Sequence, residues 1–285
     1  MRPLLIIAVL TLFMVGVDLY TLRGIQHLCA PARDGNLLFF YIYWGVTLLM
    51  FLALIRAGTQ FQHLRDPSRF FGVMLIIGVF LMLYLPKLLF NLSQLLGDIS
   101  MVVMSLFRKD AADFRSWFLV PGAILGLLVF SGFGWGMTKG RTHLKVHRES
   151  IEVPRLPESF QGLRVVQLSD IHLAGFYQHP GYIRKVVNQV NQLQPDLILF
   201  TGDMVHNFAE ETFPFVEILN GLKAPLGKFA VLGNHDYGAY FQWKSKEEEL
   251  ANLEQVKEQI RTCGFDLLLN EHRTLTLNAH SLEII

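Results

Sequence analysis

The sequence predicts a membrane domain of four helices followed by an α/β domain with a parallel sheet. Hydrophobic residues make up 52% of the chain and charged residues only 17%, and the mean hydropathy is +0.35. The apolar residues of the first half form long unbroken stretches, whereas the second half alternates short apolar runs with amphipathic segments. We therefore expect a transmembrane domain over residues 1–137, a linker over 138–162 and an α/β domain over 163–285.

Four apolar stretches in the first half are each long enough to cross the bilayer core, which takes about 20 residues. They are residues 3–22, 37–55, 70–90 and 117–137. Charged residues are rare in them, and Asp18 and Lys87 lie near the ends of the first and third stretches. No stretch carries a string of charges at mid-membrane depth. The sequence therefore lacks the intramembrane charged residues that are typical of transporters.

The distribution of Lys and Arg predicts the orientation in the membrane. Four spans place both chain ends on one side, and the short loops on that side carry eight basic residues against five on the other. The eight are Arg2, Arg56, Arg65, Arg69, Lys139, Arg141, Lys145 and Arg148, and the five are Arg23, Arg33, Arg108, Lys109 and Arg115. Since basic loops stay in the cytoplasm, we expect a multi-pass protein of the bacterial inner membrane with its second domain in the cytoplasm.

The first part of the second domain has a β-α-β-α-β pattern. Residues 163–168, 196–201 and 228–232 are short, apolar runs typical of buried strands. Residues 181–193 and 211–222 carry apolar side chains at helical spacing. Such alternation favours parallel strands joined by right-handed crossovers, with ligands bound at the carboxyl edge of the sheet.

A short polar motif follows each of these strands. The motifs are Ser-Asp-Ile-His at 169–172, Gly-Asp at 202–203 and Gly-Asn-His-Asp at 233–236. Each one alone is common in turns, but three in order after three strands predict one shared site. Carboxylates, imidazoles and an amide suit a divalent cation such as Mn, Fe or Zn. A carboxylate such as Asp203 can bridge two ions, which is the arrangement of metal-assisted phosphoester hydrolysis.

With these motifs, residues 163–285 resemble the calcineurin-like metallophosphoesterase superfamily, in particular its membrane-anchored bacterial branch. The resemblance implies the β-α-β-α-β half of a layered α-β-β-α sandwich. It also implies two divalent metal ions, with Asp170 and His172 on one, Asp203 bridging, and Asn234 on the second. The nucleophile is then a metal-activated hydroxide, because bound metal lowers the pKa of water to roughly 7.

The resemblance also implies catalytic roles for the last motif. His235 is expected beside the scissile phosphate, where it stabilises charge or protonates the leaving oxygen, and Asp236 is expected to orient His235. His206 occupies a position where many relatives carry Asp. It either faces the substrate or is a solvated loop histidine, and the second outcome is the more common for such residues.

The family completes its site with a further His and a Gly-His-x-His motif, which this sequence does not contain. The sequence therefore predicts a truncated domain, in which each metal has fewer protein ligands. We expect such a chain to bind metal weakly and to turn over poorly.

Two classes of function follow. The first is a membrane-bound phosphohydrolase acting on a phosphorylated small molecule or a lipid-linked substrate, for which UDP-diacylglucosamine is one example in the superfamily. The second is a non-catalytic membrane protein that uses the phosphoesterase-like domain as a scaffold or sensor. A net charge of +1 gives no reason to expect nucleic acid, so the expected partners are the lipid bilayer and the substrate.

Overall fold

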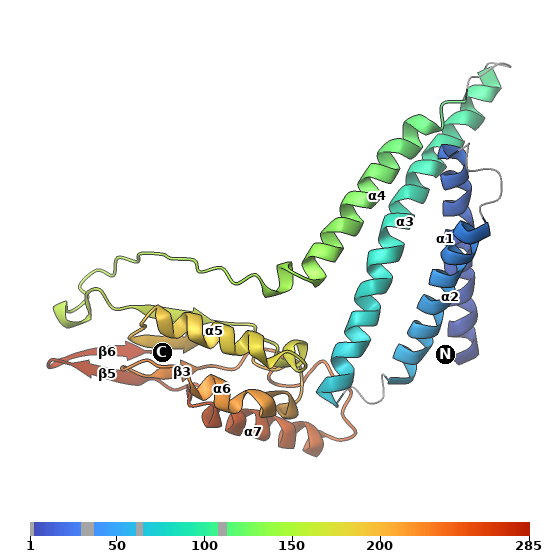
Figure 1. The fold of residues 1–285 in the computed structure, drawn as a ribbon. Coiled ribbons are helices and arrows are strands. Elements are labelled where there is room, and N and C mark those ends of the chain that lie inside the picture. Colours follow the sequence, from blue (N-terminus) through green and yellow to red (C-terminus); the bar gives the residue numbers. More distant parts are fainter. Residues whose placement is uncertain (1–2, 30–36, 61–64, 108–112) are drawn as a thin grey trace. The chain divides into compact units, whose positions relative to one another are not determined.

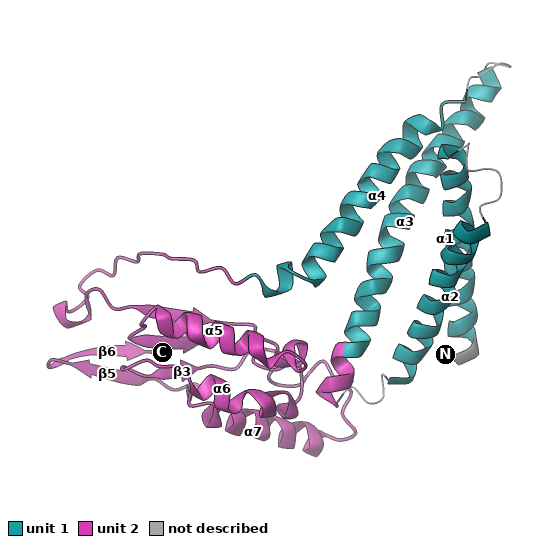
Figure 2. Cartoon of the chain, in the orientation of Figure 1, with its two compact units in different colours: residues 1–62, 72–143 teal, residues 63–71, 144–285 magenta. Residues whose placement is uncertain are grey.

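The structure is a computed structural model that describes residues 3–29, 37–60, 65–107 and 113–285. The chain divides into two compact units (Figure 2). The membrane unit contains residues 1–62 and 72–143, and the α/β unit contains residues 63–71 and 144–285. Four of the basic residues used to predict the orientation, Arg2, Arg33, Arg108 and Lys109, lie outside the described residues.

The membrane unit is built from the expected long apolar helices (Figure 1). They are α1 (Pro3–Leu28), α2 (Leu37–Gln60), α3 (Pro67–Phe107) and α4 (Ser116–Met137). Within the described residues, these four helices are long and apolar enough to cross a membrane. Many large apolar side chains on them are exposed, as a lipid-facing surface requires.

Helix α3 is much longer than the sequence predicts, with 41 residues. The apolar run ends at Phe90 because polar residues follow it, but the helix continues since those side chains face α1. Three of them, together with two polar residues that precede Phe90, recur every three or four residues and form a polar seam. The seam consists of Tyr84, Lys87, Asn91, Gln94 and Asp98. The prediction that Lys87 lies near the end of a span is therefore wrong, because Lys87 is at the middle of α3.

Asp18 of α1 is the centre of this seam and is fully buried. Its carboxylate accepts hydrogen bonds from Lys87 Nζ at 2.5 Å, Tyr84 at 2.8 Å, Thr47 at 2.7 Å and Tyr43 at 3.0 Å. These donors come from α2 and α3, so one carboxylate joins three helices. Polar groups are tolerated in an apolar environment only when they are hydrogen-bonded or paired in this way.

We expect Asp18→Ala to destabilise the protein by about 3–5 kcal/mol, because it leaves the Lys87 ammonium buried without a counter-charge. Replacing both residues, Asp18→Leu with Lys87→Met, should restore most of that loss. Unfolding in detergent measures both effects. The control is Asp113→Ala, which removes a carboxylate that is 43% exposed and should change stability by less than about 1 kcal/mol. A double variant as unstable as the single one would contradict this account.

Small residues let α4 approach α3 closely. A Cβ on Gly122 would lie 2.6 Å from the Ser93 Cβ, and one on Gly126 would lie 3.2 Å from the Pro86 carbonyl oxygen. Two glycines four residues apart on one helix face are a common contact motif in membranes.

The α/β unit contains a parallel sheet of four strands in the order β1-β2-β3-β4. The strands are β1 (Val165–Leu168), β2 (Leu197–Phe200), β3 (Lys228–Ala230) and β4 (Asp266–Leu267). Helices α5 (Pro180–Gln192), α6 (Val216–Asn220) and α7 (Lys246–Thr262) lie between them in sequence. The predicted β-α-β-α-β order is confirmed, and α7 with β4 extends it by one more repeat.

The second predicted helix, over 211–222, differs in the structure. The 3₁₀ helix η6 (Ala209–Phe215) occupies its first part, and the α-helix begins only at Val216. Pro214 lies inside η6. Proline has no N–H for the α-helical ladder, which accounts for the tighter, shorter helix here.

The two faces of β2 contact different layers. Ile198 and Phe200 belong to the large core formed with α5, α6 and α7. Leu197 packs in a smaller cluster against an antiparallel pair, β5 (Arg273–Leu277) and β6 (His280–Ile284). The described part of the unit thus has a helical layer, a parallel sheet and a second, two-stranded sheet.

Candidate metal centre

The three motifs meet at the carboxyl edge of the parallel sheet. The loop after β1 runs beside the loop after β2, because Asp170 N–H donates to the Gly202 carbonyl at 3.0 Å and His172 N–H to the Asp203 carbonyl at 3.1 Å. The third motif joins them through His235 N–H, which donates to Asp203 Oδ1 at 2.9 Å. The parallel topology therefore brings together residues that are far apart in the sequence.

Three of the predicted ligands have left-handed backbones. The φ angles are 54° at Asp170, 48° at His172 and 58° at Asp203. Residues other than glycine rarely adopt this region, and each such residue costs about 1–3 kcal/mol. Strain of this kind persists where the surroundings fix it, and here it is concentrated at the edge that collects the polar side chains.

The side chains form a set of donors suited to a divalent cation. His172 Nε2 lies 3.8 Å from Asp203 Oδ2 and 4.0 Å from Asp170 Oδ1. One potential ligand atom each from His172, Asp203 and His235 lies within 4.8 Å of the other two. Imidazole with carboxylate oxygen is a donor set for Mn, Fe or Zn. The residues present therefore fit the divalent metal that the resemblance implies.

Backbone carbonyls fix the tautomers of two histidines. His172 Nδ1 lies 3.3 Å from the Val205 carbonyl oxygen, and His235 Nδ1 lies 2.9 Å from the His206 carbonyl oxygen. A carbonyl only accepts, so each Nδ1 carries the hydrogen. The Nε2 atom of each ring is left for a metal or substrate, as is typical of ligating and catalytic histidines.

Tyr240, which the sequence did not single out, holds both key residues of the third motif. Its hydroxyl accepts a hydrogen bond of 2.6 Å from Asn234 Nδ2, so the Asn234 oxygen is the atom left for a cation. Its ring stacks on His235 with centroids 4.4 Å apart. No sequence spacing marks Tyr240, because the loop after the motif turns back to bring it there.

Asp236 is fully buried and joins the second and third motifs. Its carboxylate accepts four backbone hydrogen bonds of 2.9 to 3.1 Å. The donors are the N–H groups of Asp203, Met204, Val205 and Gly233. Burial raises the pKa of Asp236, and the N–H groups of Gly233, Val205 and Asp203 oppose the shift. The structure thus differs from the expectation that Asp236 orients the His235 ring, since the His206 carbonyl makes that contact and Asp236 holds the loops.

Glu211, also missed by the sequence reasoning, holds the other side of the loop after β2. It is 1% exposed and accepts N–H groups from His206 at 2.6 Å, Asn207 at 3.0 Å, Phe208 at 2.9 Å and Ala174 at 3.3 Å. Burial raises the pKa of this carboxyl, and the backbone donors oppose the shift. The sequence feature that could have identified Glu211 is its position as an acidic residue at the start of a helix, three residues after Phe208.

His206 is not the solvated loop histidine that was the more common expectation. Its Nδ1 atom is buried, and its ring lies 4.6 Å from the His172 ring, centroid to centroid. Burial lowers the pKa of His206 to about 4, and His172 and His235 act in the same direction. His206 is therefore neutral at pH 7 and lies beside the candidate metal ligands.

The glycines of the motifs are required by the close approach of two loops. At Gly202, φ is +100° and a Cβ would lie 2.4 Å from Gly233 N. At Gly233, a Cβ would lie 2.2 Å from Asp203 Oδ1. Only glycine permits this geometry without displacing the carboxylate.

We expect Gly233→Ala to weaken Mn binding at least tenfold, because the new methyl group displaces the Asp203 carboxylate. The free energy of unfolding should fall by about 1–3 kcal/mol, the typical cost of an overpacked site. The control is Gly181→Ala near the start of α5, where a Cβ would meet nothing within 4 Å. Calorimetric Mn titration and thermal unfolding check both variants, and unchanged Mn affinity in Gly233→Ala would contradict the geometry.

An α/β unit that gathers carboxylates and imidazoles at one sheet edge has the features typical of metal-dependent hydrolases. Two family models match the chain: "Probable Calcineurin-like phosphoesterase, transmembrane domain" over residues 1–141, and "Calcineurin-like phosphoesterase" over residues 163–282. The chain belongs to the calcineurin-like metallophosphoesterase superfamily and carries a membrane domain.

Several curated proteins are similar to this chain. The uncharacterized metallophosphoesterase YkuE of Bacillus subtilis is 29% identical over 55% of this chain and 52% of its own length. A transmembrane protein with metallophosphoesterase domain from Danio rerio is 27% identical over 80% of this chain and 50% of its own length. UDP-2,3-diacylglucosamine pyrophosphatase LpxG of Chlamydia trachomatis is 41% identical over 34% of this chain and 30% of its own length.

The chain spans about half the length of the first two of these relatives. No solved structure matches it significantly.

Proposed function

We propose that this protein is a membrane-bound, metal-dependent phosphohydrolase that cleaves a phosphoester or pyrophosphate. One observation carries the proposal. Asp170, His172, Asp203 and His235 converge at one sheet edge, with both imidazoles held through Nδ1 so that Nε2 is available. A purely structural role requires neither the convergence nor the strained backbone of the three ligands.

The proposed metal ligands are those that the sequence indicated. Asp170 and His172 would hold one divalent ion, Asp203 would bridge to a second, and Asn234 would hold the second through its side-chain oxygen. Such ions supply Lewis acidity and an activated water to phosphoester hydrolysis. The protein keeps the ligands in place, since Tyr240 fixes the Asn234 amide and backbone carbonyls fix the histidine rings.

His235 is the proposed proton donor. The His206 carbonyl accepts the Nδ1 hydrogen, so Nε2 is the ring atom that is directed to the substrate. His235 Nε2 would then donate its hydrogen to the leaving oxygen, or stabilise the negative charge that develops on the phosphoryl group.

We further propose a lipid-linked substrate. The support is the set of four membrane helices on the same chain and the similarity to LpxG, which is named for a diacylated sugar nucleotide. The test uses the intact protein in detergent with Mn, offering UDP-2,3-diacylglucosamine and a water-soluble aryl phosphodiester. We expect Mn-dependent cleavage of both, with a higher kcat/KM for the lipid. Mn binding without cleavage of either would instead support the second class of function, a scaffold or sensor.

We propose the bacterial inner membrane as the location, with the α/β unit in the cytoplasm, from the excess of basic residues on that side. A reporter fused after Ser150 tests the orientation. A fluorescent protein that folds only in the cytoplasm should be bright, and alkaline phosphatase, which requires the oxidising periplasm, should be inactive. The reverse result would overturn the orientation and would place the site among periplasmic substrates.

A further inference from the structure

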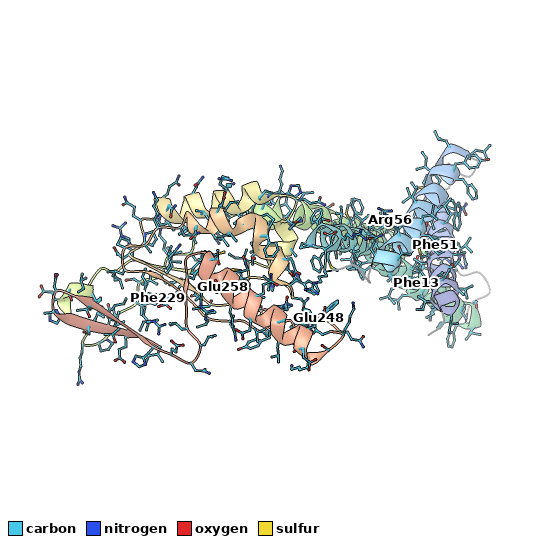
Figure 3. The ribbon with its side chains drawn as sticks, turned by 90° about the horizontal axis from the view of Figure 1, so that it is seen from below. Phe13, Phe51, Arg56, Phe229, Glu248 and Glu258 are labelled. Atoms are coloured by element: carbon cyan, nitrogen blue, oxygen red, sulfur yellow. The ribbon has the colours of Figure 1, made fainter. Side chains whose placement is uncertain are left out.

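The first residues of α3 belong to the α/β unit rather than to the membrane unit (Figure 2). Together with the two described residues that precede α3, Arg65 and Asp66, we call this segment, residues 65–71, the α3 foot. Its Arg65 pairs with carboxylates from two elements of the α/β unit. Arg65 Nε lies 2.9 Å from Glu210 Oε1 in η6. Arg65 Nη1 lies 2.8 Å from Glu248 Oε1 at the start of α7, where Figure 3 labels Glu248. Two paired acids fix the position of the foot better than one exposed ion pair would.

Phe70 connects the foot to the metal centre. The ring of Phe70 lies 4.6 Å from the ring of His206, centroid to centroid. The His206 ring is in turn 4.6 Å from His172, and its carbonyl oxygen accepts the Nδ1 hydrogen of His235 at 2.9 Å. One residue, His206, is therefore in contact with the foot, a proposed ligand and the proposed proton donor.

A second contact lies on the same segment. Gln178 Nε2, from the loop after β1, donates to the Ser68 carbonyl at 3.4 Å. The foot thus touches the loop after β1, the loop after β2 and the start of α7. The two loops carry the first two motifs of the site, and the start of α7 carries Glu248, one of the two acids that pair with Arg65.

We infer that the α3 foot positions the catalytic machinery, with Phe70 holding His206 so that the His206 carbonyl fixes His235. Glu211 and Asp236 hold the loop of residues 203–208 through its backbone, and Phe70 packs on its histidine side chain. The effect on catalysis rests on the proposed function, whereas the packing of Phe70 on His206 does not. Because α3 is one continuous helix from Pro67 to Phe107, the residue that fixes His206 belongs to a membrane-spanning element.

The kinetic test compares two neighbouring phenylalanines. Phe70→Ala should lower kcat for the soluble aryl phosphodiester by about 10–100-fold, because a misplacement of about 1 Å in a reacting group has effects of this size. KM should change little, since Phe70 is a positioning residue. The matched control is the neighbouring Phe71→Ala, because the Phe71 ring contacts His179, with the ring centroids 5.8 Å apart. Phe70→Leu, which restores apolar bulk, should recover much of the rate. Equal losses in both alanine variants would overturn the inference.

A second measurement needs no activity. Diethylpyrocarbonate modifies accessible imidazoles, and mass spectrometry of the peptides gives the rate for each histidine. We expect Phe70→Ala to speed modification of His206 several-fold and Phe71→Ala to leave it unchanged. An unchanged His206 rate in Phe70→Ala would show that the foot does not cover this residue. If the intact protein cleaves no phosphoester, the proposed function fails, but these rates still decide the packing.

The role of Arg65 can be tested by a double-mutant cycle with the same readout. Arg65→Ala and Glu248→Ala should each speed His206 modification, and the double variant should be no faster than Arg65→Ala alone, because paired residues are not additive. Additive effects would show that the pair does not hold the foot in place.

Discussion

Asp203→Asn should lower metal-dependent hydrolysis by at least about 10²-fold, since Asp203 is the proposed bridging ligand and metal ions of this kind stabilise a transition state by several kcal/mol. Asp203 is 7% exposed, and its Oδ1 accepts the His235 N–H while Oδ2 lies 3.8 Å from His172 Nε2. Asparagine keeps the shape and one oxygen, so the hydrogen bond to His235 can persist. It removes the charge and the second oxygen, which are what a bridging ligand requires.

The measurement combines Mn titration with hydrolysis of an aryl phosphodiester by the intact protein. Mn affinity and rate should fall together in Asp203→Asn, and a chelator should abolish the wild-type rate. The control is Asp196→Asn at the opposite end of β2, where the carboxylate accepts Arg164 N–H at 2.8 Å. Activity that survives both the chelator and Asp203→Asn would exclude the two-metal mechanism.

The convergence of the motifs could be predicted because it depends only on topology. Each motif follows a strand, and parallel neighbours end at one edge, so Asp170 and Asp203 meet whatever the details of the loops. The membrane helices were predictable for an equally general reason, since bilayer thickness sets the length of an apolar span. The length of helix α3 was not predictable in this way, because hydropathy cannot recognise that the polar residues of a helix face another helix.

The residues that support the site were not predictable in the same way. Tyr240, Glu211 and Phe70 act through loop conformations and long-range packing, which no local pattern encodes. Asp236 illustrates the same limit within a motif. Its presence was expected, but only the structure shows that its carboxylate binds the backbone of the loop after β2, and that a carbonyl takes the role of orienting His235.

His235→Ala should lower kcat by about 10²–10³-fold, the usual cost of losing one preorganised donor, while Mn affinity stays close to that of the wild type. The structure makes this a sharp test, because an Nε2 or Nδ1 atom of His235 also lies within 4.8 Å of potential ligand atoms of His172 and Asp203. If His235 is a ligand, Mn affinity must fall with the rate. If it is the proton donor, only the rate falls.

The choice of leaving group separates the two roles further. A proton donor matters most when the leaving oxygen is basic, so His235→Ala should slow an alkyl phosphodiester more than a nitrophenyl one. The matched control is His179→Ala, since His179 is exposed and its ring contacts that of Phe71 at 5.8 Å, centroid to centroid. Equal slowing of both esters together with lost Mn affinity would reassign His235 from proton donor to ligand. The His206 carbonyl at Nδ1 would then serve to direct Nε2 toward the metal instead of the leaving oxygen.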